Sequence, residues 1–96
     1  MPYIKQSQRD NLDPAIEELS HRIRLTCAQD GVESDGLLNY TVTSLVLQVL
    51  LDLGVSYALL EKSIGVLECA KLELYRKAAA PYEDKKALDN GEVYPS

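Results

Sequence analysis

Apolar residues recur at every third or fourth position between Ser56 and Ala80, which is the spacing of one face of an α-helix. Lys71 falls in the middle of this face, where the pattern asks for another apolar residue. A lysine in apolar surroundings extends its ammonium group to water, pairs with an acid or meets an anion. We therefore predict one long amphipathic helix, with Lys71 as its most unusual residue. The apolar residues of the face are Tyr57, Leu60, Ile64, Leu67, Leu74 and Ala78.

Two more helices are predicted before this one. Asp13 can cap a first helix in which Pro14 takes the first position, and Gly31 ends it. Asn39 can cap a second helix that stops at Gly54. Its Thr-Val-Thr run also permits a strand, but about 14 residues is long for a strand, so a helix is the better interpretation.

The third helix is predicted to begin at Ser56, which can cap it, and to be broken by Pro81. One or two further turns then end at Asn90-Gly91. Residues 1–11 have the composition of an N-terminal arm, and residues 92–96 that of a C-terminal tail. The predicted fold class is all-α, with three main helices and a short C-terminal helix in a single helical domain, residues 1–96.

The second and third helices carry more apolar residues than a three-helix packing can cover. Leu47 and Leu51 add a second apolar stripe to one of them, and Leu59 and Val66 do so for the other. Helices that are apolar on two sides are normally buried on two sides. The sequence therefore predicts a small helical bundle that forms a homo-oligomer.

The chain is short and acidic, which excludes some functions. It has 96 residues, 46% of them apolar, and a net charge of −5. General, sequence-independent nucleic-acid binding needs a basic surface, so we do not expect it. A few converging cations can still hold one compact anion.

The cysteines and the N-terminus indicate the compartment. Cys27 and Cys69 lie in predicted helices without the spacing of a metal site, as is typical of thiols in a reducing cytosol. Residues 1–10 contain no apolar run of the secretory type. The stretch Leu45 to Leu53 is interrupted by polar residues and is too short to span a bilayer. We therefore expect a cytoplasmic protein without membrane contact.

No catalytic motif stands in the chain. His21 is the only histidine, so a histidine-based metal cluster or a catalytic triad has almost no components. The glutamates on the first and third helices do not repeat as the paired carboxylates of a pyrophosphohydrolase. We expect neither an enzyme nor a cofactor or metal site.

An anion site is the most specific chemical hypothesis. Lys71 lies one turn from Tyr75, and Arg76 follows directly. Tyrosines such as Tyr40 and Tyr82 can stack on a base and also donate a hydrogen bond. Cations among tyrosines suit a phosphate-bearing nucleotide. The alternative is that Lys71 pairs with Glu68, or with an acid of a neighbouring subunit, and only sets the helix register.

Four segments carry a resemblance: MPYI, LNYT, IGVLECAKLELYR and APYEDKK. They resemble a family of small uncharacterised proteins common in phages and prophages. The resemblance covers most of the chain, is weakest from Gln29 to Asp35, and implies source and size better than activity. The matching segments contain the polar residues Asn39, Tyr40, Thr41, Glu68, Lys71, Tyr75, Arg76, Tyr82 and Glu83.

Two functional hypotheses follow. The first is a non-enzymatic phage-type protein that binds and sequesters a nucleotide-derived signal and so counters host antiviral defence. This is an analogy with other small phage proteins. The second is an adaptor or inhibitor that binds a host or phage protein through its acidic surface. The residues predicted to bind the ligand are Asn39, Tyr40, Lys71, Tyr75, Arg76 and Tyr82.

Overall fold

The computed structural model describes residues 2–95, and in this range the secondary structure is entirely helical. The all-α prediction is confirmed. The chain divides into two compact units, one comprising Tyr3–Leu60 and the other made mainly of residues 61–95. Met1 of the predicted arm and Ser96 of the predicted tail lie outside the described residues.

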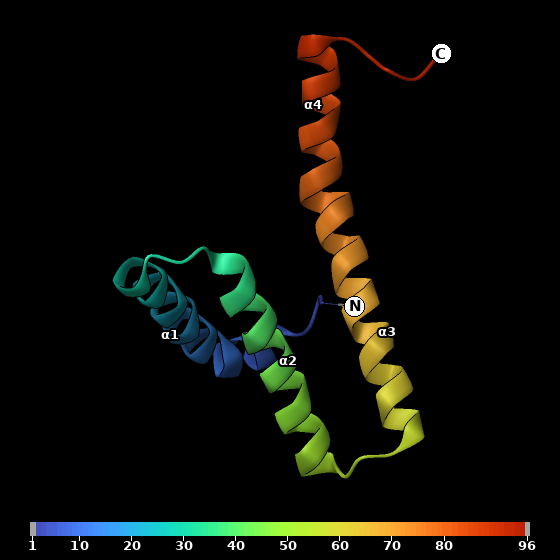
Figure 1. Ribbon diagram of the computed structural model, residues 1–96. Helices are drawn as coiled ribbons and strands as arrows, with labels where there is room; N and C mark the ends of the chain where they lie inside the picture. Colours follow the sequence, from blue (N-terminus) through green and yellow to red (C-terminus); the bar gives the residue numbers. More distant parts are fainter. Residues whose placement is uncertain (1, 96) are drawn as a thin grey trace. The chain divides into compact units, whose positions relative to one another are not determined.

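The first unit is a helical hairpin of α1 (Gln6–Asp30) and α2 (Ser34–Leu53), drawn in blue and green (Figure 1). Helix α1 begins before Asp13, so the predicted arm of residues 1–11 is too long. The start is stabilised by Gln8, whose Oε1 accepts the Lys5 amide N–H at 3.0 Å. Arg9 also donates its Nε–H to the Ile4 carbonyl at 3.0 Å. Pro14 consequently lies inside the helix instead of at its first position.

The turn between α1 and α2 follows the predicted end of the first helix. Gly31 adopts a left-handed conformation (φ 65°) and donates its N–H to the Cys27 carbonyl, which closes α1. Helix α2 then begins at Ser34, so the prediction that Asn39 caps it was wrong. The Asn39 Oδ1 accepts the Thr43 hydroxyl at 3.4 Å within the helix. Asp35 lies in the first turn, where a carboxylate is favoured by the helix dipole.

Helix α3 (Tyr57–Leu74) has the predicted start. The Ser56 Oγ accepts the Leu59 N–H at 3.2 Å, which is the hydrogen bond of an N-cap. Gly54, at φ 90°, separates α2 from this cap. The side-chain cap and the glycine stop thus act where the sequence places them.

The prediction that Pro81 breaks the third helix was wrong. A π-helical turn, η1 (Tyr75–Ala79), joins α3 directly to α4 (Ala80–Asn90), and Figure 1 shows them running on without a break. In a regular α-helix the proline ring would clash with the carbonyl four residues earlier. Here the Ala80 N–H bonds the Tyr75 carbonyl five residues back, so the wider turn accommodates Pro81. Gly91 ends α4 as predicted.

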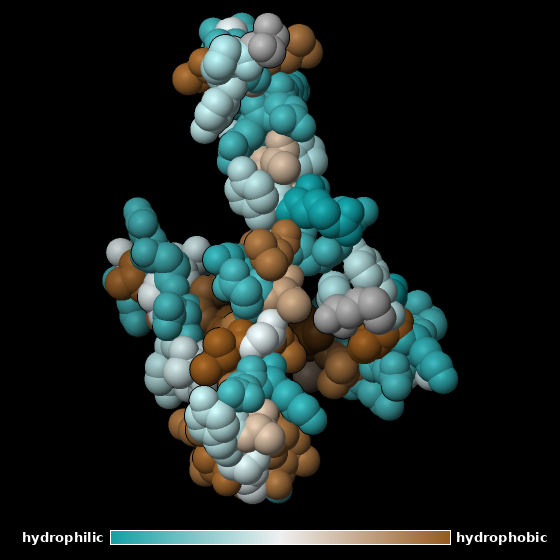
Figure 2. Space-filling view, turned by 90° about the vertical axis from the view of Figure 1, so that its right-hand side faces the viewer, coloured by the Kyte–Doolittle hydropathy of each residue, from teal (hydrophilic) through white to brown (hydrophobic). Residues whose placement is uncertain are grey.

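Few side chains are covered in either unit. Among the described residues, Leu50 on α2 is the single buried hydrophobic side chain, with 7% of its surface exposed. Large apolar side chains such as Leu45, Leu51 and Ile64 are more than half exposed. Figure 2 shows apolar side chains, in brown, open on the surface. Helices α2 and α3 therefore carry the uncovered apolar surface that their sequences predict.

Helix α2 is longer than the apolar stretch Leu45 to Leu53 taken alone. The stretch Leu45 to Leu53 is part of the 20-residue helix Ser34–Leu53, in which an 18-residue window has a mean hydropathy of 1.4, so the helix is long and apolar enough to cross a membrane. The criterion is one of length and composition, and core helices of soluble proteins and signal sequences also satisfy it. Only 6% of this span is buried.

Candidate functional site

Lys71 lies on α3 and is exposed, not buried in an apolar contact. Its Nζ is 2.9 Å from Glu68 Oε1, and the two side chains are 68% and 55% exposed. The pairing with Glu68 that the sequence allows is therefore present. Because both groups face solvent, this ion pair contributes little to stability, of the order of 0–1 kcal/mol. It leaves the ammonium group accessible to a ligand.

The second cation, Arg76, lies at the start of the π-helical turn. Its Nη2 is 2.7 Å from Glu73 Oε1, and the guanidinium side chain remains 64% exposed. Arg76 is thus held by an acid of its own helix, as Lys71 is. An ammonium carries three N–H donors and a guanidinium five.

Helices α3, η1 and α4 run on as one continuous helix, which we call the rod. Tyr75 forms a longer-range contact along this rod. Its hydroxyl donates to Glu83 Oε2 at 3.4 Å, eight residues further on. The negative charge of Glu83 is the main cause of a raised pKa at Tyr75, with smaller effects from desolvation and from the hydrogen bond itself. The phenol is therefore a neutral hydrogen-bond donor over the whole physiological range.

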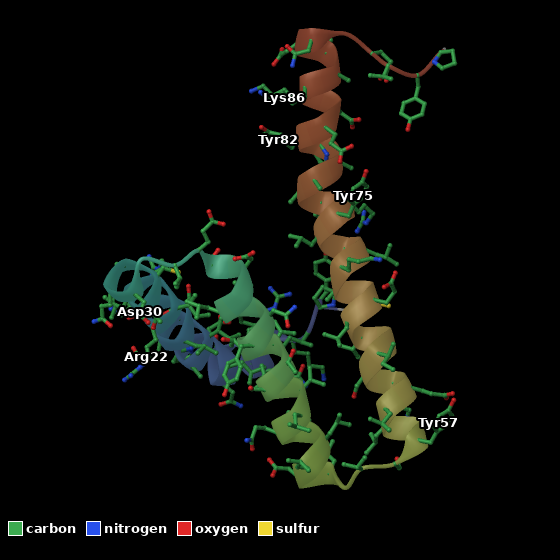
Figure 3. The ribbon with its side chains drawn as sticks, viewed as in Figure 1. Arg22, Asp30, Tyr57, Tyr75, Tyr82 and Lys86 are labelled. Atoms are coloured by element: carbon green, nitrogen blue, oxygen red, sulfur yellow. The ribbon has the colours of Figure 1, made fainter. Side chains whose placement is uncertain are left out.

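Tyr82 lies on another side of the rod from Tyr75. In Figure 3 the two rings point to different sides of the helix, and Lys86 lies on the side of Tyr82. The Lys86 Nζ is 5.6 Å from the centroid of the Tyr82 ring, a cation–π distance. Tyr75 and Tyr82 therefore do not share one face of this helix.

Asn39 and Tyr40 belong to the first unit, on α2. Tyr40 is 73% exposed, and the Asn39 amide oxygen accepts a hydrogen bond from the Thr43 hydroxyl. The structure thus gathers Lys71, Tyr75 and Arg76 on consecutive turns, places Tyr82 on a different side of the same rod, and puts the remaining two residues in a separate unit.

Three polar residues contact these side chains but were not predicted from the sequence to belong to the site. Glu73 forms an ion pair with Arg76, and Glu83 accepts a hydrogen bond from Tyr75. The Lys86 ammonium lies over the Tyr82 ring. The four-residue spacing of Tyr82 and Lys86, within the helical turns predicted after Pro81, was readable from the sequence. The contact of Tyr75 with Glu83 had no such signal, because it depends on the π-helical turn.

The first unit contains an apolar groove between α1 and α2. Its volume is about 350 Å³, and none of the six predicted ligand residues lines it. The lining residues are Ile16, Leu19, Ser20, Ile23, Arg24, Ser34, Leu38, Thr41, Val42 and Leu45. Among residues 2–95, no group of three or more His, Cys, Asp or Glu side chains is arranged to hold a metal ion.

Comparison with known proteins places the chain in a family. No curated protein and no solved structure matches it. The match to a family is nearly complete, because it extends over both units, from residue 1 to residue 93. The chain therefore belongs to the family described as Domain of unknown function (DUF6899).

Proposed function

We propose that this protein is a non-enzymatic, self-associating binding protein that sequesters a nucleotide-derived signalling molecule. The observation that carries the proposal is the succession of Lys71, Tyr75 and Arg76 on two exposed turns. Their cationic groups are 68% and 64% exposed by side chain, and the neutral Tyr75 phenol lies between them in the sequence.

The chemistry of these three side chains suits a phosphorylated nucleoside. A phosphate accepts charge-assisted hydrogen bonds from Lys71 and Arg76, each contributing about 1.5–3 kcal/mol. The Tyr75 ring offers a face for stacking on the base, an interaction worth about 1–3 kcal/mol. The ion pair of Lys71 with Glu68 is exposed on both sides, so exchanging Glu68 for phosphate costs little.

Self-association is part of the proposal. The apolar side chains of α2 and α3 stand open in the described part of the chain, and a homo-oligomer would cover them. It would also let Tyr40 or Tyr82 of another subunit complete the ligand site, since one chain's rod presents Tyr75 and Tyr82 on different sides.

The biological setting is proposed from the resemblance alone. Segments such as LNYT and APYEDKK are similar to those of small phage and prophage proteins. In that setting a protein that captures a nucleotide signal in the host cytoplasm would blunt antiviral defence. No membrane contact and no general nucleic-acid binding are proposed, the second because of the net charge of −5.

The second candidate is an adaptor or inhibitor of a host or phage protein. It is favoured by the same open apolar side chains, which a partner protein would cover as well as a second copy would. An acidic surface would select a basic partner.

The nucleotide proposal is tested by melting the pure protein with a panel of cyclic and ADP-ribose-type nucleotides. A ligand present at about a hundred times its Kd stabilises the folded state by about 2.7 kcal/mol. For a chain of this size we expect a rise in Tm of about 10–20 °C with one class of nucleotide, and none with inorganic phosphate or adenosine at equal concentration. A flat response across the panel would favour the adaptor.

A further inference from the structure

We infer that a second copy of the same hairpin binds in the α1–α2 groove. The two copies are antiparallel and are related by a two-fold axis near Ser20. The groove has apolar residues of both helices in its lining, with Ile16 and Leu45 at one end and Arg24 and Ser34 at the other. This inference rests on the self-association proposed above and adds which surface forms the contact.

The chain exposes more surface area than compact proteins of its mass, which favours such a contact. A compact protein of 10.7 kDa exposes about 5,500 Å², and two separately folded halves of that mass expose about 6,600 Å² together. This chain exposes 8458 Å². The chain thus exposes about 1,900 Å² more surface than two separately folded halves would. Each partner in a stable protein interface buries about 800 Å². One standard interface fits within the surplus.

The charges beside the groove select the orientation. Arg24 lines one end of it, and Glu17 lies two helical turns earlier on the same side of α1. Among the described residues, neither forms an ion pair within its own chain, whereas Glu18 and Arg22, on another side of α1, pair at 3.0 Å. A parallel pairing would bring like charges together at each end. An antiparallel pairing centred on Ser20 sets Arg24 of each copy opposite Glu17 of the other.

Charge reversal tests this arrangement by sedimentation of the full-length protein at a series of concentrations. Glu17→Arg and Arg24→Glu, each alone, place two like-charged pairs in the interface, and we expect each to weaken association about tenfold or more. The double variant Glu17→Arg/Arg24→Glu should recover the association. An equimolar mixture of the two single variants should also associate, as mixed pairs. Glu18→Arg, the neighbouring control, should behave as the unmodified protein.

The apolar lining is tested by a matched pair on α2. Leu45 and Leu51 are both 58% exposed, but only Leu45 lines the groove. Leu45→Asp should abolish the association through the groove, and Leu51→Asp should leave it intact. Because both side chains are exposed, the far-UV circular dichroism of both variants should stay helical.

The outcomes separate the two proposals. A natural-sequence protein that stays monomeric at all concentrations overturns self-association itself. Association that survives Leu45→Asp, or that shows no rescue by the double variant or the mixture, overturns the groove pairing alone. Monomeric protein that floats with phosphatidylcholine–phosphatidylglycerol vesicles, and no longer does so as Leu45→Asp, would assign the apolar surface to lipid and overturn the pairing.

Discussion

The Tyr75 hydroxyl donates a hydrogen bond to Glu83 at 3.4 Å across the π-helical turn that precedes Pro81. In a regular α-helix, residues eight apart lie on different sides, since two turns take about 7.2 residues. One π-turn adds about one residue to that count. The two side chains therefore align because the helix widens, and the widening also makes room for the proline.

The first prediction concerns the ionisation of Tyr75. The charge of Glu83 raises the pKa of this phenol above its ordinary value of about 10. Glu83→Gln removes the charge, so the phenol should ionise at lower pH than in the unmodified protein. The phenolate absorbance is followed as a function of pH, and subtraction of the Tyr75→Phe curve isolates this residue.

The sign of the linked stability follows. Because folding raises the pKa, the contribution of the pair is fully present below about pH 10 and is lost as the pH rises through the folded pKa. The difference in Tm between the protein and Glu83→Gln should therefore shrink above about pH 10. Asp84→Asn is a control that keeps the hydrogen bond and removes a weaker charge effect. A Tyr75 titration that does not change on the Glu83→Gln substitution would show that the contact does not persist in solution.

The second prediction concerns Pro81. Pro81→Ala supplies an amide N–H and removes the ring, so the π-turn loses its cause and a regular α-helix becomes accessible. We expect a rise in thermal stability, of the order of 1–3 kcal/mol in unfolding free energy. We also expect the pKa of Tyr75 to fall, since Glu83 would rotate away. Thermal melts and the same tyrosine titration measure both, and a destabilised variant with an unchanged titration would contradict the explanation.

The predictable parts of the fold are those that a few neighbouring residues determine. Gly31 and Gly54 end helices because their backbones reach positive φ, and Ser56 caps α3 with its own hydroxyl. The start of α1 was not predictable in this way. It depends on Lys5, which is no typical cap, and on the Gln8 side chain that reaches back to its amide.

In the candidate site, too, the predictable features are those that neighbouring residues determine. Lys71, Tyr75 and Arg76 were placed together by helical spacing, and the structure holds them on consecutive turns. Whether they bind a nucleotide stays a prediction. The side of the helix on which Tyr82 lies could not be predicted. The sequence does not show whether a proline breaks a helix or is accommodated by a π-helical turn. The groove between α1 and α2 required the packing of two helices and has no local signal.

The third prediction tests the cap of α3. Ser56→Ala removes the hydroxyl that accepts the Leu59 N–H at 3.2 Å. The loss of such a cap costs about 1 kcal/mol, which corresponds to about 4–8 °C in Tm for a chain of this size. Differential scanning calorimetry measures it. Ser56→Asp, which keeps an acceptor, should retain the stability, and an equal loss in both variants would place the cause elsewhere.

The fourth prediction is the effect of Lys71→Met on ligand binding and on stability together. Methionine keeps the length and the apolar stem of lysine but removes the charge. If Lys71 contacts phosphate, losing a charge-assisted hydrogen bond of about 1.5–3 kcal/mol weakens nucleotide binding about ten- to a hundredfold. Because the pair with Glu68 is exposed on both sides, the variant should melt within a few degrees of the unmodified protein.

The structural alternative gives the opposite pattern. If Lys71 instead pairs with an acid of a neighbouring subunit inside the oligomer, removing it leaves a buried carboxylate unpaired. Stability and association then fall, and affinity per folded site does not. Lys62→Met, on the same helix, serves as the matched control for the loss of one positive charge. Calorimetric titration and thermal melts of the two variants, made on the same samples, separate the cases, and a lowered Tm with unchanged affinity for Lys71→Met would refute the ligand role.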